Sequence, residues 1–387
     1  MQATLGLAAA FATLPMASHA QAVSHGGMER VASIPGPMIT GVTVSHKGRV
    51  FINFPHWGDD VPFTVAEIVN GKAVAYPNAQ INRINKAHPD KCLYSVQSVV
   101  VDPDDRLWAL DTGSVKLGPN VPGGPKLVCI NLATNKIIRT YFFPRSVVPA
   151  AAYLNDVRFD LSRGAKGIAY LTDSGNKGPS GFVMVDLASG KSWRRLGHTP
   201  SVKPEKGLTL IVEGQPLLER IPGNKPKQPG FANDGIALGA GGKRIFYSPV
   251  LAHHLYSVSV DALSDPNRSE ADVEKTVVNE GARPTGSDGL EADTAGRVYC
   301  TADEKRGIIV RLPDGTYQTP DGTYQTLVAD PRLAWPDTMS LATNGYLYFT
   351  DSQLNRMPRY HNGHDLRTHT YGVYRIRVNA KPVLLTK

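Results

Sequence analysis

One pattern recurs six times along the 387 residues, and this repetition limits the possible folds more than any other feature of the sequence. Each copy starts with a polar residue and a short strand with alternating apolar positions, followed by a turn and a second apolar strand. The copies start at Thr40, Gln97, Asn155, Asp234, Asp288 and Asp337. Successive starts lie 49 to 79 residues apart, which is typical of a β-propeller with one four-stranded blade in each repeat.

Hydrophobic periodicity assigns the repeats to β-structure. Val99 and Val101 in one copy, and Val157 and Phe159 in the next, occupy every second position and would share one buried face. No long stretch shows the 3.6-residue period of an amphipathic helix. The sequence therefore predicts an all-β fold, a six-bladed β-propeller with four-stranded antiparallel blades around a central channel, formed by residues 30–387 as a single domain. The widest spacing, after Asn155, indicates an insertion at about residues 197–230, which we interpret as a loop over one face.

The amino-terminal residues have the pattern of an export signal. An apolar stretch at residues 4–18 precedes small residues around Ala20 and Ala22, which predicts a signal peptide over residues 1–22. We therefore expect a secreted protein, either extracellular or periplasmic. The stretch is too short to span a bilayer and no other window is apolar enough, so we expect no membrane span.

The formal net charge of +8 does not by itself indicate a nucleic-acid-binding surface. Lys and Arg are scattered, and their densest stretch, residues 203–227, is rich in Pro and Gly and typical of a solvated loop. The sequence also contains no G-x-G-x-x-G fingerprint, P-loop or G-x-S-x-G elbow. We expect a monomer whose partner is a small molecule and not a nucleic acid.

Three cysteines in an exported chain allow at most one internal disulfide. Cys92 and Cys129 bracket one repeat, and we predict that they form this disulfide. Cys300 lies in a strand pattern, where a buried free thiol is expected. No Cys/His spacing indicates a metal site built on the cysteines.

Several motifs, in order along the chain, resemble the major royal jelly protein and yellow family. They include DRLWALDTG from Asp105, LVCINL from Leu127, NDVRFD from Asn155, YLTDSG from Tyr170 and WPDTMSL from Trp335. The resemblance covers roughly residues 30–380. It implies a six-bladed propeller, an extracellular or periplasmic location and a small-ligand role. Some relatives are similar to dopachrome-converting enzymes and others bind biogenic amines in the channel, so the resemblance does not select one activity.

The polar residues that start the six copies are the candidate ligand-binding site. They are Thr40, Gln97, Asn155, Asp234, Asp288 and Asp337. The first strand of a propeller blade lines the channel, so we expect these side chains to meet near one mouth. Three carboxylates in one ring raise each other's pKa unless a positive charge lies between them, which favours a cation or an amine as the ligand. Each Asp or Asn can also cap a turn by accepting backbone N–H groups, and this structural interpretation stays open.

The strand openings are also similar to those of gluconolactonase and regucalcin-like propellers. In that resemblance Asp288 takes the place of a metal-binding aspartate, Asp234 of a metal-binding asparagine and Asn155 of an asparagine that contacts substrate. The sequence departs from that family at Thr40, which replaces a glutamate ligand. Losing this carboxylate weakens the implied metal site.

Three functions follow as hypotheses, and a pure scaffold, whose channel is plugged by side chains, is the alternative to them. The first is the binding of a small molecule, an amine or a cation, at the mouth of the channel. The second is a metal-dependent lactonase or esterase, with Ca²⁺ or another divalent cation held by Asp234, Asp288 and Asn155, and with Asp337 or Asp156 as the catalytic base. The third, an isomerase or oxidoreductase similar to dopachrome-converting enzymes, is supported only by the family resemblance.

The remaining polar candidates have structural interpretations. Asp111, Asp173 and Asp351 end their strands in a shared pattern, and we interpret them as hydrogen-bonding residues between blades. The irregularly spaced histidines are interpreted as solvated, with Arg356 and Arg359 near the rim of the mouth. These histidines are His253, His254, His361, His364 and His369. The duplicated heptapeptide PDGTYQT at residues 313–326 is assigned no function.

Overall fold

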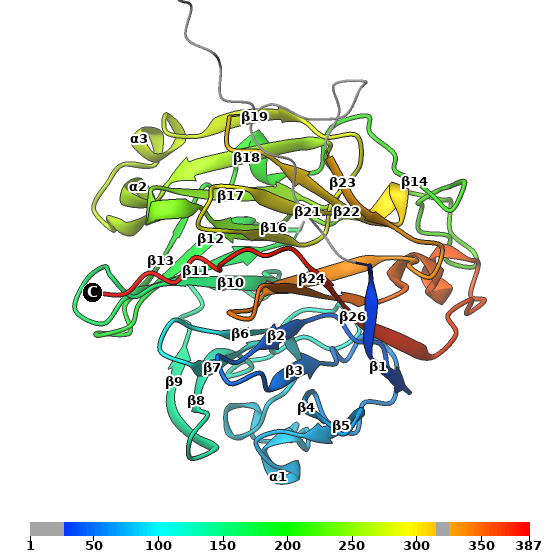
Figure 1. Ribbon diagram of the computed structural model, residues 1–387, viewed down its shortest axis with the longest axis horizontal. Helices are drawn as coiled ribbons and strands as arrows, with labels where there is room; N and C mark the ends of the chain where they lie inside the picture. The colour runs from blue at the N-terminus through cyan, green and yellow to red at the C-terminus, as the bar shows by residue number, and fades with distance from the viewer. Residues whose placement is uncertain (1–26, 176, 315–324) are drawn as a thin grey trace, which may run out of the picture.

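The computed structural model describes residues 27–175, 177–314 and 325–387 and has the predicted fold, a six-bladed β-propeller (Figure 1). Six four-stranded antiparallel sheets follow one another along the chain, and the first strand of each sheet contacts the first strand of the next. The ring closes because the first strands of blades 6 and 1 are also in contact. The predicted signal peptide and most of the duplicated heptapeptide lie outside the described residues.

The strands are short, as the alternating pattern of the repeats requires. Blade 1 is β2 (Val42–Val44), β3 (Val50–Asn53), β4 (Val65–Val69) and β5 (Lys72–Ala75); blade 2 is β6 (Val96–Val101), β7 (Arg106–Thr112), β8 (Pro125–Asn131) and β9 (Lys136–Phe142); blade 3 is β10 (Leu154–Asp160), β11 (Ile168–Asp173), β12 (Gly181–Asp186) and β13 (Ser192–Arg195). Blade 4 is β16 (Asn233–Leu238), β17 (Arg244–Pro249), β18 (His254–Ser259) and β19 (Val278–Ala282); blade 5 is β20 (Leu290–Ala292), β21 (Val298–Ala302), β22 (Gly307–Arg311) and β23 (Gln325–Ala329); blade 6 is β24 (Pro336–Leu341), β25 (Tyr346–Asp351), β26 (Thr370–Arg377) and β1 (Glu29–Pro35).

The helices among the described residues are α1 (Ala79–Asn82), α2 (Val260–Ser264), α3 (Glu270–Glu274), η1 (Pro89–Lys91), η2 (Pro200–Val202), η3 (Ala240–Gly242), η4 (Asp303–Lys305), η5 (Leu354–Arg356) and η6 (Pro358–Tyr360). Within residues 27–175, 177–314 and 325–387, none of them is long and apolar enough to cross a membrane.

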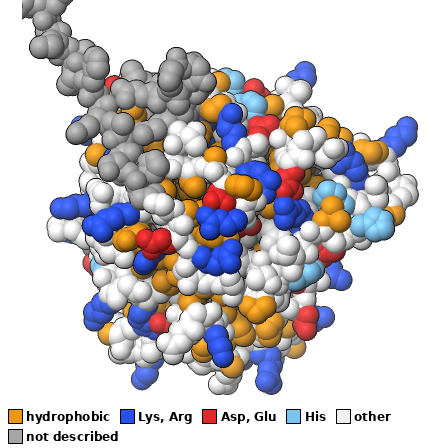
Figure 2. Space-filling model, turned by 45° about the vertical axis from the view of Figure 1, so that its right-hand side comes forward, with side chains coloured by type: hydrophobic (Ala, Val, Ile, Leu, Met, Phe, Trp, Pro, Cys, Tyr) orange, Lys and Arg blue, Asp and Glu red, His pale blue; other side chains and the backbone are white. Residues whose placement is uncertain are grey.

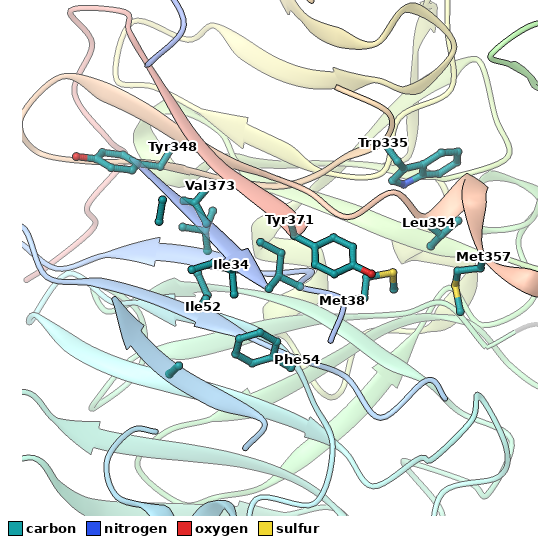
Figure 3. Close-up of a cluster of buried hydrophobic side chains, with 14 of the residues drawn as sticks. Ile34, Met38, Ile52, Phe54, Trp335, Tyr348, Leu354, Met357, Tyr371 and Val373 are labelled. Carbon is teal, nitrogen blue, oxygen red and sulfur yellow. The ribbon is translucent and has the colours of Figure 1, made fainter. Parts of the chain in front are cut away.

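Blade 6 contains strands from both ends of the chain. β1 is its outermost strand and pairs in antiparallel orientation with β26, which precedes the carboxyl terminus. Ile34 of β1, Ile52 of β3 and Val373 of β26 lie in one buried apolar cluster that joins blades 6 and 1 (Figure 3). The ring is therefore held closed by apolar burial between these two blades as well as by strand pairing.

The insertion predicted after blade 3 lies between β13 and β16. It contains a short hairpin, β14 (Ile211–Val212) paired with β15 (Gln215–Pro216), which appears on the right-hand side of Figure 1. Its carboxylates anchor the segment to other parts of the propeller. Glu205 pairs with His254 at 3.1 Å, Glu213 accepts from Arg356 Nε at 2.9 Å, and Glu219 pairs with Arg359. The insertion is thus a strap that ion pairs tie to the propeller, while residues 221–228 within it stay exposed to solvent.

Side chains of the second strands hold the openings of the first strands in the following blades. Asn53 Nδ2 donates to the Gln97 carbonyl oxygen at 3.0 Å, Thr172 Oγ1 donates to that of Asp234 at 2.7 Å, and Thr350 Oγ1 donates to that of Thr40. Because a buried carbonyl oxygen without a partner is costly, these bonds fix the backbone at the positions of the candidate site residues.

The interpretation of Asp111, Asp173 and Asp351 as blade-to-blade residues is wrong. Each carboxylate accepts backbone N–H groups from the loop that leads into the first strand of its own blade. Asp111, for example, accepts from Tyr94 at 2.6 Å and from Ser95 at 2.9 Å. The shared strand-end pattern therefore fixes the start of the inner strand within one blade.

The last described residues cross the far end of the channel. Pro382 forms an isolated bridge with Asp293 of blade 5, and Leu385 forms one with Asp160 of blade 3. Beneath this segment lies a cavity of about 70 Å³, lined by the distal ends of the inner strands. The residues that open the inner strands lie at the other end of the channel. The carboxyl-terminal segment therefore covers one end, and the candidate site residues lie at the opposite end.

The predicted disulfide is not formed, because Cys92, Cys129 and Cys300 are all free and buried. Lys126 of β8 contacts the turn before Cys92, because its Nζ donates to the Pro89 carbonyl oxygen at 3.0 Å. Cys129 lies three residues further along β8, which is roughly 10 Å at a rise of about 3.3 Å per residue. A disulfide needs Cα atoms within about 7 Å, so bracketing one repeat does not bring these cysteines together.

We expect three titratable thiols per chain when the protein is unfolded in guanidinium without reductant. In the folded protein burial raises the pKa of Cys129 to about 12, so its thiolate is scarce and it should react slowly. Titration with Ellman's reagent before and after unfolding checks both points. A single thiol in the unfolded, unreduced chain would show instead that Cys92 and Cys129 are paired.

Candidate functional site

Five of the six residues that start the repeats line one cavity of about 370 Å³. They are Gln97, Asn155, Asp234, Asp288 and Asp337. Cavities that bind small molecules typically have volumes of roughly 300–1,000 Å³, and this one falls within that range.

Four of these side chains lie at β-bulges, one in each of four blades. The pairing of the first and second strands shifts register at Gln97 in blade 2, at Asn155 in blade 3, at Asp234 in blade 4 and at Asp337 in blade 6. A residue in a bulge is left out of the regular ladder, and its side chain takes a new direction. The first residues of these strands therefore leave the regular up-and-down alternation, and their polar side chains face the channel.

Two residues predicted for the site lie outside the cavity lining. Thr40 is fully buried, and its hydroxyl donates to the Gln97 carbonyl oxygen at 3.2 Å while accepting from Asn53 at 2.8 Å. Asp156 accepts from the Ser98 hydroxyl at 2.7 Å and pairs with Arg158 at 2.9 Å. Thr40 therefore joins blades 1 and 2, and Asp156 is bonded to Ser98 and Arg158 outside the cavity lining and is not placed to act as a base there.

The carboxyl groups of Asp234, Asp288 and Asp337 form a coupled acidic floor. Burial and the negative charge of Asp288 raise the pKa values of Asp234 and Asp337 well above the usual range for aspartate. Burial also raises the pKa of Asp288, although the hydrogen bond from Trp335 Nε1, 2.6 Å from Oδ2, opposes this rise. Asn155 Nδ2 donates to Asp234 Oδ1. The carboxyl groups of Asp234 and Asp288 lie close enough to interact, and their raised pKa values favour a proton on this pair when no cation is bound.

Aromatic side chains form a wall of the same cavity beside this floor. Trp57 Nε1 donates to the Tyr153 hydroxyl at 2.5 Å, and this hydroxyl donates to Gln97 Oε1 at 2.9 Å. Trp335 and Phe231 also line the cavity. The sequence prediction missed all four. The repeats did contain a signal for two of them, because Tyr153 and Trp335 each lie two residues before a residue of the polar ring.

The strap and two loops form the rim. Ile221, Lys227 and Phe231 of the insertion line the cavity together with Lys177, from the loop between β11 and β12, and Arg359 of η6. Figure 2 shows Lys and Arg side chains beside Asp and Glu on the face turned forward from the right-hand side of Figure 1, where the strap lies. Arg359 was expected at the rim, whereas Lys177 and Lys227 occur in loops without a repeat and were not singled out.

The histidines do not line the cavity. His253 Nε2 lies 2.7 Å from Glu304 Oε2, and His254 pairs with Glu205, so both lie in the contact that anchors the strap. His361 Nε2 bonds to the Asn355 carbonyl oxygen at 2.9 Å, and His369 lies 3.2 Å from Asp365. These histidines are therefore hydrogen-bonded within loops, in addition to being partly solvated.

A divalent cation does not fit the polar ring as its residues are arranged. Asn155 directs its amide N–H toward Asp234, and the hydroxyl of Thr40, at the place of the missing glutamate, is bonded away from the cavity. Across the part of the chain that the structure describes, no group of three or more His, Cys, Asp or Glu is placed to hold a metal ion. The predicted ligands Asp234, Asp288 and Asn155 do meet, but as a hydrogen-bonded network.

Comparisons with known proteins agree with the sequence motifs. A family described as Major royal jelly protein matches residues 94–383, about three quarters of the chain. Protein yellow of Drosophila guanche is 26% identical over 242 residues, which cover 59% of this chain and 40% of that protein. Protein yellow of Drosophila melanogaster is 26% identical over 247 residues, covering 59% and 42%. The chain thus spans about two fifths of the length of the curated relatives it matches.

Three solved structures are similar to this chain in fold alone. Luciferin-regenerating enzyme has a TM-score of 0.54 at 11% identity, covering 93% of this chain and 98% of that one. The calcium-binding protein regucalcin from Agrobacterium tumefaciens has a TM-score of 0.51 at 13% identity, covering 92% and 97%. A gluconolactonase from Xanthomonas campestris has a TM-score of 0.50 at 9% identity, covering 93% and 100%.

Proposed function

The chain belongs to the major royal jelly protein family, and from this premise we propose that it binds a protonated organic amine in the cavity at the mouth of its channel. The observation that carries the proposal is the acidic floor, in which Asp234, Asp288 and Asp337 face one cavity and are each less than a tenth exposed. Buried carboxylates are costly unless a positive charge lies between them, and an ammonium group supplies both this charge and N–H donors.

The aromatic wall supports an amine with an aromatic body. Trp57, Tyr153 and Trp335 line the cavity beside the floor, and their rings offer apolar surface and negative faces to a cation. Trp335 serves twice, because its Nε1 also orients the carboxylate of Asp288. An ammonium bound at the floor would therefore replace the proton on the pair of Asp234 and Asp288, while the aromatic body covers it from water.

The contacts do not favour the two enzymatic alternatives. A lactonase of the regucalcin type would need the cation that the ring does not fit, and Asp156 is already paired with Arg158. Asp337 lines the cavity but lies within the acidic floor, where burial and the charge of Asp288 favour its protonated form. The isomerase hypothesis rests on the family resemblance, and no contact in the cavity adds to it.

Export is part of the proposal. The residues at 4–18 have the pattern of a signal peptide, and β1 starts only at Glu29, so cleavage near Ala22 would leave the propeller intact. Amino-terminal sequencing of the protein recovered outside the cytoplasm would test this point, and an uncleaved chain retained inside would contradict it.

We expect tryptamine to bind at about neutral pH at least about 30-fold more tightly than tryptophol, in which a hydroxyl replaces the ammonium. This ratio corresponds to about 2 kcal/mol, typical of one buried hydrogen bond to a charged group. Isothermal titration of both compounds against the same protein measures it. Equal affinities would contradict the proposal, and so would displacement of bound tryptamine by low concentrations of Ca²⁺.

The affinity for tryptamine should rise with pH between about pH 5 and pH 8. The pKa values of Asp234, Asp288 and Asp337 are raised by burial and, for Asp234 and Asp337, by the charge of Asp288, so these groups are largely neutral at low pH and ionise as pH rises. With raised pKa values the folded, ligand-free protein binds more protons than the unfolded chain, so their contribution to stability is present at low pH and is lost as pH rises. Bound ammonium offsets this loss. The increase in Tm caused by tryptamine should therefore be larger at about pH 8 than at about pH 5, and an equal increase would count against the floor as the amine site.

A further inference from the structure

The rim of the cavity has the opposite charge to its floor. Lys177, Lys227 and Arg359 line the outer part of the cavity, and they come from three separate segments of the chain. At the floor, Asp234 and Asp288 lie close enough to interact at the openings of two inner strands. Trp57, Tyr153 and Trp335 line the same cavity, which therefore combines acidic, aromatic and basic surface.

The cations of the rim are not fully neutralised by the protein. One carboxylate, that of Glu219, accepts from Arg359 and also lies 3.3 Å from Lys227 Nζ. Arg359 Nε is buried without a hydrogen-bond partner. Among the described residues, Lys177 has no carboxylate within ion-pair distance. At the entrance to the cavity, Arg359 and Lys227 thus share the carboxylate of Glu219, and Lys177 adds a third positive charge.

An anionic group of the ligand would satisfy these donors. The side chain of Lys227 is 68% exposed, whereas that of Glu219 is 8% exposed, so the positive charge faces the open side and the negative charge is covered. Electrostatic complementarity of this kind orients a ligand as well as attracting it. A ligand with a single positive charge would meet repulsion at the rim before it reached the floor.

We propose that the ligand is a zwitterion, an aromatic amine with an anionic group at the end of the molecule away from its ammonium. The inference rests on the proposed function, because the ammonium occupies the acidic floor formed by Asp234, Asp288 and Asp337. The aromatic body lies against the wall, and the anion contacts Lys177 and Lys227. An α-amino acid does not meet this requirement, since its two charges are attached to one carbon atom and cannot reach opposite ends of the cavity.

The test compares two ligands of nearly the same shape, para-(aminoethyl)benzoate and para-(aminoethyl)benzamide. Both carry the ammonium, but only the benzoate carries the distal negative charge. We expect isothermal titration at low salt to give an affinity about five- to tenfold higher for the benzoate, and this preference should shrink as salt is added. Lys177→Met and Lys227→Met should each bring the ratio of benzoate affinity to benzamide affinity closer to one.

Lys225→Met is the matched control, because Lys225 is an exposed lysine of the same strap that does not line the cavity. It should keep the preference of the unmodified protein for the benzoate. If both compounds bind and their affinities are equal, the zwitterion inference fails and the proposed amine site stands. If neither compound nor tryptamine binds, the proposed function fails and the inference fails with it.

Discussion

Replacing Asp288 with asparagine should weaken tryptamine binding about 30-fold or more at neutral pH. The hydrogen bond from Trp335 Nε1 favours the ionised form of Asp288, so among the three aspartates of the floor this one keeps its negative charge most readily. Removing one partner of a buried, hydrogen-bonded charge pair costs about 2–5 kcal/mol, and about 1.4 kcal/mol is a tenfold change in affinity. Asparagine keeps the volume and can still accept from Trp335, so isothermal titration reports the loss of charge.

Asp303→Asn is the control for this variant. Asp303 is fully buried, and its pKa is raised well above the usual range by burial and by the charge of Asp288, yet it does not line the cavity. Since asparagine resembles the protonated carboxyl group, we expect Asp303→Asn to bind tryptamine within about threefold of the unmodified protein. Similar losses in both variants would show that Asp288 acts through the general charge of the region and not by contacting the amine.

Replacing Asp111 with alanine should lower the free energy of unfolding by about 3–5 kcal/mol, as expected when one partner of a buried ion pair is removed. Lys126 and Asp111 lie 2.7 Å apart, and their side chains are 2% and 0% exposed. The same carboxylate accepts the backbone N–H groups of Tyr94, Ser95 and Gly113, so alanine leaves a buried ammonium without its counter-ion and three amides without their acceptor. Urea denaturation followed by fluorescence measures the change.

The double variant Asp111→Ala/Lys126→Met separates the two contributions. Methionine removes the buried charge, so the double variant should be more stable than Asp111→Ala by about 1–3 kcal/mol, with the lost amide acceptors accounting for the rest. A single variant within about 1 kcal/mol of the unmodified protein would show that water reaches Lys126 and that the pair is not an essential part of blade 2.

Repetition made the fold and five cavity residues predictable from the sequence. Gln97 and Asp337 differ chemically, but each opens the first strand of its blade, and a propeller places equivalent positions around one axis. Tyr153 and Trp335 were predictable by the same reasoning, since they hold the same position relative to the ring. Position in the repeat was more informative than residue type.

The remaining features depend on contacts that do not repeat. Lys177, Lys227 and Phe231 lie in loops that occur once, and no period marks them. Thr40 occupies the right position in its repeat, yet its hydroxyl is bonded to the backbone of blade 2. Cys92 and Cys129 bracket one blade, but the strand between them carries Cys129 away from the loop of Cys92. Such outcomes follow from tertiary distances, which a local pattern does not contain.

The pairing of β1 with β26 has a consequence for how the protein is made. A ribosome releases the chain from its amino end, so Glu29–Pro35 emerges first and must wait for nearly the entire polypeptide before its partner exists. Until then its unpaired edge is exposed to other chains. Folding of this protein during synthesis is therefore expected to depend on chaperones that hold the nascent amino end apart, and an early pause or truncation should yield aggregates in place of a smaller, five-bladed ring.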